Sequence, residues 1–412
     1  MPLSIRAGVP SVVDIEVRDI DDRPVVWVDV DSTDRQGALS STSSSQGWGQ
    51  AARAIADCSG VVPVLMIVDG PAVSGPALLI GLADLVVMTS DSYAFVSGPT
   101  MVAEFTGVAI DNEELGGPSS HARYSGAASL VAGDLDAAAE MIANLLAYLP
   151  AHNDEEPPTW PTDDSIDRST PEAGALMPTT STGSYDVRDV IKAIVDDAEI
   201  LELRPRWASN VVTAFATIGG LPVGVVANQP ISLAGTLDIP ASQKAARFVT
   251  FCDAFNLPII TFVDTPGFYP GKDLEWRGMI RHGAQLVFAY GRATVPRICV
   301  VLRKSYGGAY IVMDSKKMGN DLCVAWPWAE LAVMGAGQAA AILQRRATPE
   351  ERAVFEAEYA ARLLNPYIAA ERGYIDAVIE PAETRSVIGH ALLTLIDKRE
   401  RLQPRPHDNT PL

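Results

Sequence analysis

The sequence predicts an α/β protein in which one fold of alternating strands and helices occurs twice in the chain. Two observations support this prediction: spaced motifs of the first half recur in the second, and a proline-rich stretch separates the halves. The 412 residues, 48% of them hydrophobic, suffice for two domains with buried cores. We expect domains at 1–150 and 185–412, joined by a linker at 151–184.

The internal repeat consists of apolar strand patterns followed by turns at equal spacings. In each half a proline opens a strand pattern and a glycine follows 13 positions later; a second proline-led strand is followed after 11 positions by a turn of small residues. Three spaced matches make chance an unlikely cause. The matching positions are Pro24 and Pro222, Gly37 and Gly235, Pro63 and Pro296, and Ser74 and Gly307.

The two copies differ in length between the glycine and the second proline. This interval spans 61 positions in the second half and 26 in the first, so the first copy is 35 residues shorter. In the second half the interval holds an expected helix at 241–255, a strand at 258–263, the loop at 264–268 and a further helix. We therefore expect a helix-strand-loop unit to be missing from the first half.

The predicted linker is distinguished by its composition. Between residues 150 and 184, six prolines alternate with acidic residues, serine and threonine, and no helical or strand period is present. The second half ends with a helix expected near 381–402.

Charge and cysteine usage limit the partners and the compartment. Thirty-two basic against 51 acidic residues give a net charge of −19, which argues against nucleic acid. The apolar run at 61–88 is interrupted by Asp69, Pro71 and Asp84, so we expect no membrane span. The first residues show no export signal, and we expect a cytoplasmic protein. The four cysteines are far apart with no CxxC pair, which predicts reduced core thiols and no metal site.

Several longer motifs resemble one enzyme family. They include Ser-Gln-Lys-Ala-Ala-Arg-Phe-Val at 242–249, Asp-Thr-Pro-Gly-Phe at 264–268, Arg-Lys-Ser-Tyr-Gly-Gly-Ala-Tyr at 303–310 and Asn-Pro-Tyr-Ile-Ala-Ala-Glu-Arg-Gly at 365–373. They are similar to the carboxyltransferase (beta) subunit of biotin-dependent acyl-CoA carboxylases, such as the propionyl- and acetyl-CoA carboxylase beta chain. The resemblance implies two crotonase-like (ClpP/crotonase) subdomains in one chain.

The resemblance is weakest over residues 1–60. Family members usually carry a longer N-terminal half with a glycine-rich Asp-Ser-Gly-Gly-Ala-Arg loop. Here Asp31 and Ser32 are followed by Thr33, Asp34 and Arg35, so the glycine pair is absent or the loop is deleted. The unequal repeat indicates the same gap independently.

The resemblance also implies an activity. Such an enzyme transfers a carboxyl group from carboxybiotin, carried on a separate protein, to the alpha carbon of a short acyl-CoA through an enolate, with deprotonation assigned to biotin itself. The implied partners are a biotin carboxylase and biotin carrier subunit. The implied assembly is a homo-oligomer with shared active sites, as a dimer or a hexamer, or a mixed oligomer with a paralogue. The N-terminal domain would bind the acyl-CoA and the C-terminal domain the carboxybiotin.

The candidate site residues lie in turns where backbone N–H groups can stabilise an anionic oxygen. The expected catalytic residues are Gly307, Gly308 and Ala309 in the second half and Ser74 and Gly75 in the first. The expected substrate-binding residues are Ile311, Tyr310, Gly267, Phe268, Gly98, Gly116 and Gly117. Pro76 has no N–H, and the sequence does not decide whether the first turn uses Ser74 and Gly75 or has lost a donor.

Two other functions stay open. The shortened first half suits a biotin-independent malonyl- or methylmalonyl-CoA decarboxylase, and it also suits a non-catalytic structural subunit of a carboxylase complex. The motifs have plainer interpretations too: Gly307 and Gly308 could form an ordinary strand-helix turn, and Gly116 and Gly117 a simple helix stop.

Overall fold

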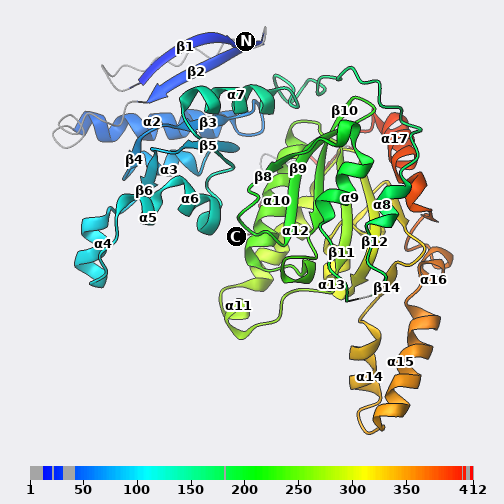
Figure 1. Ribbon diagram of the computed structural model, residues 1–412. Helices are drawn as coiled ribbons and strands as arrows, with labels where there is room; N and C mark the ends of the chain where they lie inside the picture. The colour runs from blue at the N-terminus through cyan, green and yellow to red at the C-terminus, as the bar shows by residue number, and fades with distance from the viewer. Residues whose placement is uncertain are drawn as a thin grey trace. The chain divides into compact units, whose positions relative to one another are not determined.

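The computed structural model describes residues 13–20, 23–30, 42–180, 182–400, 402–404 and 409–411. Contacts divide the chain into two compact units, Met1–Glu155 and Glu156–Leu412 (Figure 1). The predicted positions around Gly37 and Asp31 lie outside the described residues.

The second unit is built on an eight-stranded sheet of order β15-β13-β12-β11-β10-β9-β8, with β14 also paired to β12. The strands from β10 onward are parallel, and β9 runs antiparallel to β8 and β10. The strands are β8 Leu201–Leu203, β9 Val211–Ile218, β10 Leu221–Asn228, β11 Ile259–Thr265, β12 Arg297–Tyr306, β13 Leu322–Ala325, β14 Glu330–Ala332 and β15 Ala377–Val378. Every residue of β9 and β11 is buried, as expected for strands covered on both faces.

Helices cover both faces of this sheet. On one face, α9 buries one side of the helix, formed by Val187, Val190, Ile191 and Ile194. These side chains belong to the same core cluster as residues of α17. On the other face α10 packs beside α12 (Figure 1), and the rings of its Phe248 and Phe251 pack at a tilt against Phe215 of β9. The helices are α8 Pro171–Ala175, α9 Val187–Ile194, α10 Ile239–Ala254, α11 Lys272–Trp276, α12 Met279–Arg292, α13 Gly307–Val312, α14 Ala336–Leu343, α15 Pro349–Leu363, α16 Pro366–Glu371 and α17 Thr384–Leu395.

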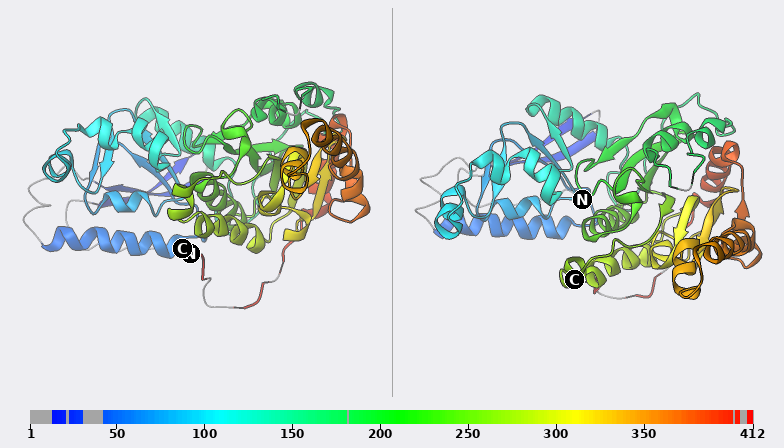
Figure 2. Two further views of the ribbon diagram at one scale, coloured as in Figure 1. Left: turned by 90° about the horizontal axis from the view of Figure 1, so that it is seen from below. Right: turned by 60° about the horizontal axis from the view of Figure 1, so that its bottom comes forward.

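The first unit has smaller sheets. A parallel sheet of order β3-β5-β7 and a parallel pair β4-β6 accompany a separate antiparallel hairpin β1-β2. Both views of Figure 2 show α2 running along this unit. Its elements are β1 Val13–Ile20, β2 Arg23–Val30, α2 Thr42–Cys58, β3 Leu65–Val68, β4 Pro71–Val73, α3 Ala77–Ile80, β5 Leu85–Thr89, β6 Tyr93–Phe95, α4 Pro99–Thr106, α5 Asn112–Gly116, α6 Pro118–Ser120, the π-helix His121–Ser125, β7 Leu130–Ala132 and α7 Leu135–Leu146.

The shorter interval in the first unit accounts for its divided sheet. In the second unit, β11 lies between β10 and β12 and joins the hairpin β9-β10 to the remaining parallel strands. In the first unit only 11 positions separate Val30 from Thr42, too few for the counterpart of α10 and β11. Consequently, among the described residues, the hairpin β1-β2 stands apart and β3 has a strand partner on one side only.

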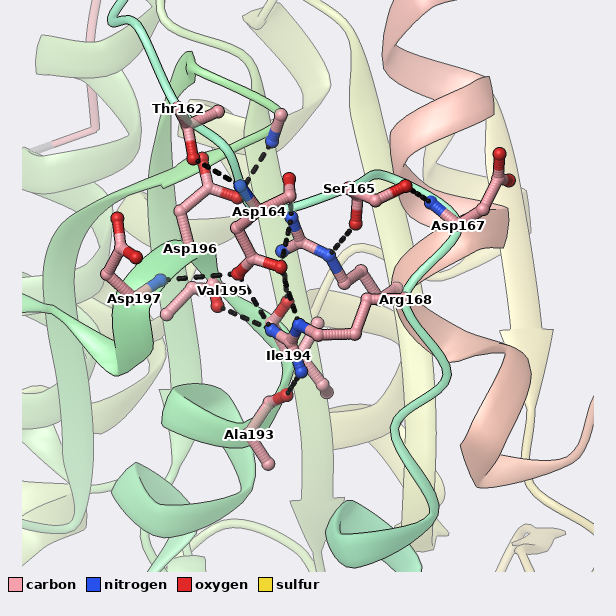
Figure 3. A network of polar contacts seen from close by, with 12 residues as sticks. Thr162, Asp164, Ser165, Asp167, Arg168, Ala193, Ile194, Val195, Asp196 and Asp197 are labelled. Carbon is pink, nitrogen blue, oxygen red and sulfur yellow. Dashed lines mark hydrogen bonds and ion pairs between the residues drawn. The ribbon is translucent and has the colours of Figure 1, made fainter.

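The predicted linker is wrong as a free tether from residue 156 onward. Arg385, fully buried on α17, donates to the carbonyl oxygens of Ser165 and Asp164 at 2.8 and 2.9 Å, and to Asp196 Oδ1 at 2.6 Å. Arg168 adds an ion pair to Asp164 at 2.6 Å (Figure 3). The segment also contains α8, so it is part of the second unit.

The final helix of the chain, Thr384–Leu395, begins later than expected, because residues 381–383 form a separate 3-10 turn. All four cysteines are free; three are buried and Cys58 is half-buried. No helix in the described part of the chain is long and apolar enough to cross a membrane.

Candidate functional site

In the second unit the candidate turn follows β12 directly. Gly307 has φ +60°, a left-handed conformation that glycine adopts without strain, and it begins α13. The N–H groups of Gly308 and Ala309 lie in the first turn, where helix geometry provides no intrahelical acceptor, and no other acceptor for them is found among the described residues. This turn therefore offers two backbone donors to a ligand.

The Gly267 and Phe268 loop forms one wall of this turn. A Cβ placed on Gly308 would lie 3.7 Å from the Phe268 ring. Leu237 fixes the loop, since its N–H donates to Gly267 O at 3.1 Å and its carbonyl accepts from Tyr269 N at 2.8 Å. Gly267 has φ +144°, which favours glycine. The structure thus brings the loop and the turn together.

Tyr310 and Ile311 differ in their surroundings. Burial raises the pKa of Tyr310, and its hydroxyl donates to Tyr374 O at 3.2 Å. The Ile311 side chain is exposed. In this unit, Ile311 is therefore the one of the two that is free to meet a ligand.

Beside the turn lies a cavity of ≈ 420 Å³. Burial lowers the pKa of Lys304, and burial with the hydrogen bond to Glu330 raises the pKa of Tyr306. Sequence reasoning missed Tyr306, Glu330 and the Gly335 region as pocket residues, because β14 reaches β12 only through sheet pairing. The cavity is lined by Pro266, Lys304, Tyr306, Glu330, Gly335, Ala336, Gly337, Gln338, Glu356, Ala360 and Leu364.

The first-unit turn has the same backbone conformation but fewer donors. Ser74 has φ +63°, matching Gly307 at +60°, so Gly75 corresponds to Gly308 and Pro76 to Ala309. The Ser74 N–H is already donated to Phe95 O at 2.9 Å. Pro76 has no N–H. Gly75 therefore supplies the one backbone donor left at this turn among the described residues.

The remaining first-unit candidates gather around β6. A Cβ on Gly116 would meet Ala94 O at 2.1 Å, and one on Gly98 would meet the Phe95 ring at 3.3 Å. A Cβ on Gly117 would meet Glu113 instead. His121, which lies on a π-helix, brings Nε2 to 2.8 Å from Ala94 O. Since β6 pairs with β4 just before Ser74, Ser74, Gly75, Gly98 and Gly116 all lie near one strand pair.

Comparison with known proteins identifies the family. The family model described as the carboxyl transferase domain matches residues 12–410. The chain belongs to the carboxyl transferase family. Its fold is the crotonase-like carboxyltransferase fold, present twice.

Several relatives and solved structures of this family are close to the chain. The propionyl-CoA carboxylase beta chain of Saccharopolyspora erythraea is 45% identical over 373 residues, covering 86% of this chain and 68% of the relative. The methylmalonyl-CoA decarboxylase subunit alpha of Veillonella parvula is 42% identical over 367 residues, covering 89% and 72%. A transcarboxylase 12S crystal structure with hydrolysed methylmalonyl-coenzyme A bound superposes with a TM-score of 0.92 at 38% identity, covering 97% of this chain and 85% of that one.

Proposed function

We propose that this chain is a carboxyltransferase subunit that transfers a carboxyl group to the alpha carbon of a short acyl-CoA. The observation that supports this most directly is the duplicated turn, in which Ser74 and Gly307 share one left-handed conformation, each before a helix. Relatives named for propionyl-CoA carboxylation and methylmalonyl-CoA carboxyl transfer support the substrate class.

The turns suit enolate chemistry because charge develops on the thioester oxygen as the alpha proton leaves. A fixed N–H donor at that oxygen lowers the barrier by about 3 kcal/mol. In the first unit this donor is Gly75, and we assign Gly98, Gly116 and Gly117 to the acyl-CoA side. The lack of a second donor at Pro76 predicts slow turnover.

The second unit fits the carrier-borne biotin. When bound, its carboxylated form supplies the carboxyl group. The N–H groups of Gly308 and Ala309 suit a ureido carbonyl oxygen, and Pro266 and Tyr306, which precede the loop and the turn in the chain, line a neighbouring pocket. Phe268 would line this site beside the Gly308 amide.

The proposed assembly follows the relatives. The transcarboxylase 12S structures are described as a hexamer assembly with substrate bound to a multienzyme core. We extend this to an oligomer of this chain that works with a biotin carboxylase and a biotin carrier protein in the cytoplasm.

A non-catalytic subunit is the second candidate function. Two features of the first unit favour it: Pro76 removes one backbone donor, and the described residues of this unit include no strand equivalent to β11. Such a chain would co-purify with an intact paralogue. Decarboxylation is a third outcome of the same experiment, since one relative is named for methylmalonyl-CoA decarboxylation.

The test is the reverse reaction, which needs no partner protein. The purified chain is incubated with methylmalonyl-CoA or malonyl-CoA, with and without free biocytin, and the decarboxylated thioester is quantified. Biocytin-dependent product supports the carboxyltransferase. Product without biocytin supports the decarboxylase, and no product in either mixture supports the non-catalytic subunit.

A further inference from the structure

A buried carboxylate lies on β11, close to where this strand leads into the Gly267–Phe268 loop of the second-unit site. Asp264 is 1% exposed and belongs to β11, one residue before that strand ends. The register of β11 against β12 shifts between Val263 and Thr265, so Asp264 lies at an irregularity of the ladder. A charged group at such a position needs partners.

Three donors from two separate segments converge on this carboxylate. Lys304 N donates to Oδ1 at 3.1 Å, in place of a ladder bond to the backbone. Arg303 Nε donates to Oδ2 at 2.9 Å, and the Tyr185 hydroxyl donates to the same oxygen at 2.9 Å. Burial raises the pKa of Asp264, and the Arg303 guanidinium opposes that rise. The side chain thus bridges the shift in the ladder between β11 and β12, beyond which backbone pairing resumes at Thr265 and Ser305.

Strands β11 and β12, which the Asp264 side chain connects, lead directly into the loop and the turn of the site. Three residues after Asp264 comes Gly267, followed by Phe268; three residues after Lys304 comes Gly307. The Phe268 ring lies 3.7 Å from the position of a Cβ on Gly308. A shift of one strand end against the other would therefore move the ring relative to the amide donors.

We propose that Asp264 is a positioning residue for the biotin side of carboxyl transfer, holding the Phe268 wall at a fixed distance from the Gly308 and Ala309 amides. The inference rests on the proposed function, because it assigns biotin to this turn. A misplacement of about 1 Å at a reacting group can cost about a hundredfold in rate. Removing the carboxylate charge should therefore affect the biotin side and spare the acyl-CoA side.

The chain offers a matched control at the other end of the same sheet. Asp196, 2% exposed, pairs with Arg385 at 2.6 Å and accepts from Gly219 N and Gly220 N at 2.9 and 2.8 Å. These glycines precede β10, which runs parallel to β11, whereas Asp264 lies at the carboxyl end of the sheet. Asp196→Asn thus weakens a buried ion pair of the same kind away from the turn.

The experiment compares Asp264→Asn, Tyr185→Phe and Asp196→Asn with the wild-type chain in the biocytin assay. For Asp264→Asn we expect kcat/KM for biocytin to fall 10- to 100-fold while KM for methylmalonyl-CoA stays within twofold. Tyr185→Phe keeps the ion pair and should raise KM for biocytin at least threefold. Asp196→Asn should lower Tm but leave both KM values within twofold.

Binding of biocytin by calorimetry separates this inference from the proposed function. If the wild-type chain binds biocytin but transfers no carboxyl group, the proposed activity fails while a tenfold weaker affinity of Asp264→Asn still supports the positioning role. Equal biocytin affinity and KM in wild type and Asp264→Asn, or an equal biocytin defect in Asp196→Asn, would overturn it. If Asp264→Asn does not fold, an unchanged KM in Tyr185→Phe overturns it instead.

Discussion

Restoring the missing amide of the first-unit turn should accelerate the enzyme. Pro76 occupies the position that Ala309 holds in the second unit, and its φ of −54° and ψ of −31° are values that alanine adopts freely. Pro76→Ala adds one N–H at the proposed thioester site. One such donor contributes about 3 kcal/mol, which corresponds to about a hundredfold in kcat.

The assay is biocytin-dependent turnover of methylmalonyl-CoA, with thermal unfolding in parallel. Pro76→Ala should cost up to about 1 kcal/mol of stability, because proline restricts the unfolded chain. Ser74→Gly is the control: it relieves the left-handed strain at φ +63° but adds no donor, so kcat should stay within about twofold. A folded Pro76→Ala chain with unchanged kcat would refute the equivalence of the two turns.

Three further outcomes test the structure itself. Burial lowers the pKa of Lys244 to about 7, which is below its value in the unfolded chain. The unfolded state therefore binds more protons than the folded state between pH 7 and 10. Relative to Lys244→Met, the free energy of unfolding measured by urea titration should rise by up to about 1.4 kcal/mol per pH unit over this range. Gly116→Ala should lower Tm by several degrees, because its Cβ would meet a backbone oxygen at 2.1 Å, whereas Gly133→Ala, with nothing within 4 Å, should not. Amides of β3 should exchange with deuterium faster than those of β12, which has strands on both sides; equal protection would contradict the open edge.

The duplicated architecture could be predicted because spacing survives where residues change. The 35-residue difference between the copies predicted the missing helix-strand-loop unit, and the strand order shows why its loss divides the first sheet. The left-handed φ of Ser74 could not be read from the sequence, since serine seldom adopts it. That angle aligns Pro76 with Ala309.

The features that could not be predicted from the sequence depend on contacts between residues far apart in the chain. Residues 156–180 have the composition of a linker, but Arg385, more than 200 positions away, holds them by two hydrogen bonds, to the carbonyl oxygens of Ser165 and Asp164. Glu330 joins Tyr306 through strand pairing alone. Neither contact can be recognised in the sequence, because neither produces a hydrophobic period or a short motif.

The most direct test of the proposed chemistry is a crystal structure of the assembled protein with a non-hydrolysable acyl-CoA analogue and biocytin. We predict the thioester carbonyl oxygen within about 3 Å of Gly75 N, and the ureido oxygen within about 3 Å of the Gly308 and Ala309 N–H groups. Ligands bound away from both turns, or turns closed by neighbouring side chains, would contradict the assignment.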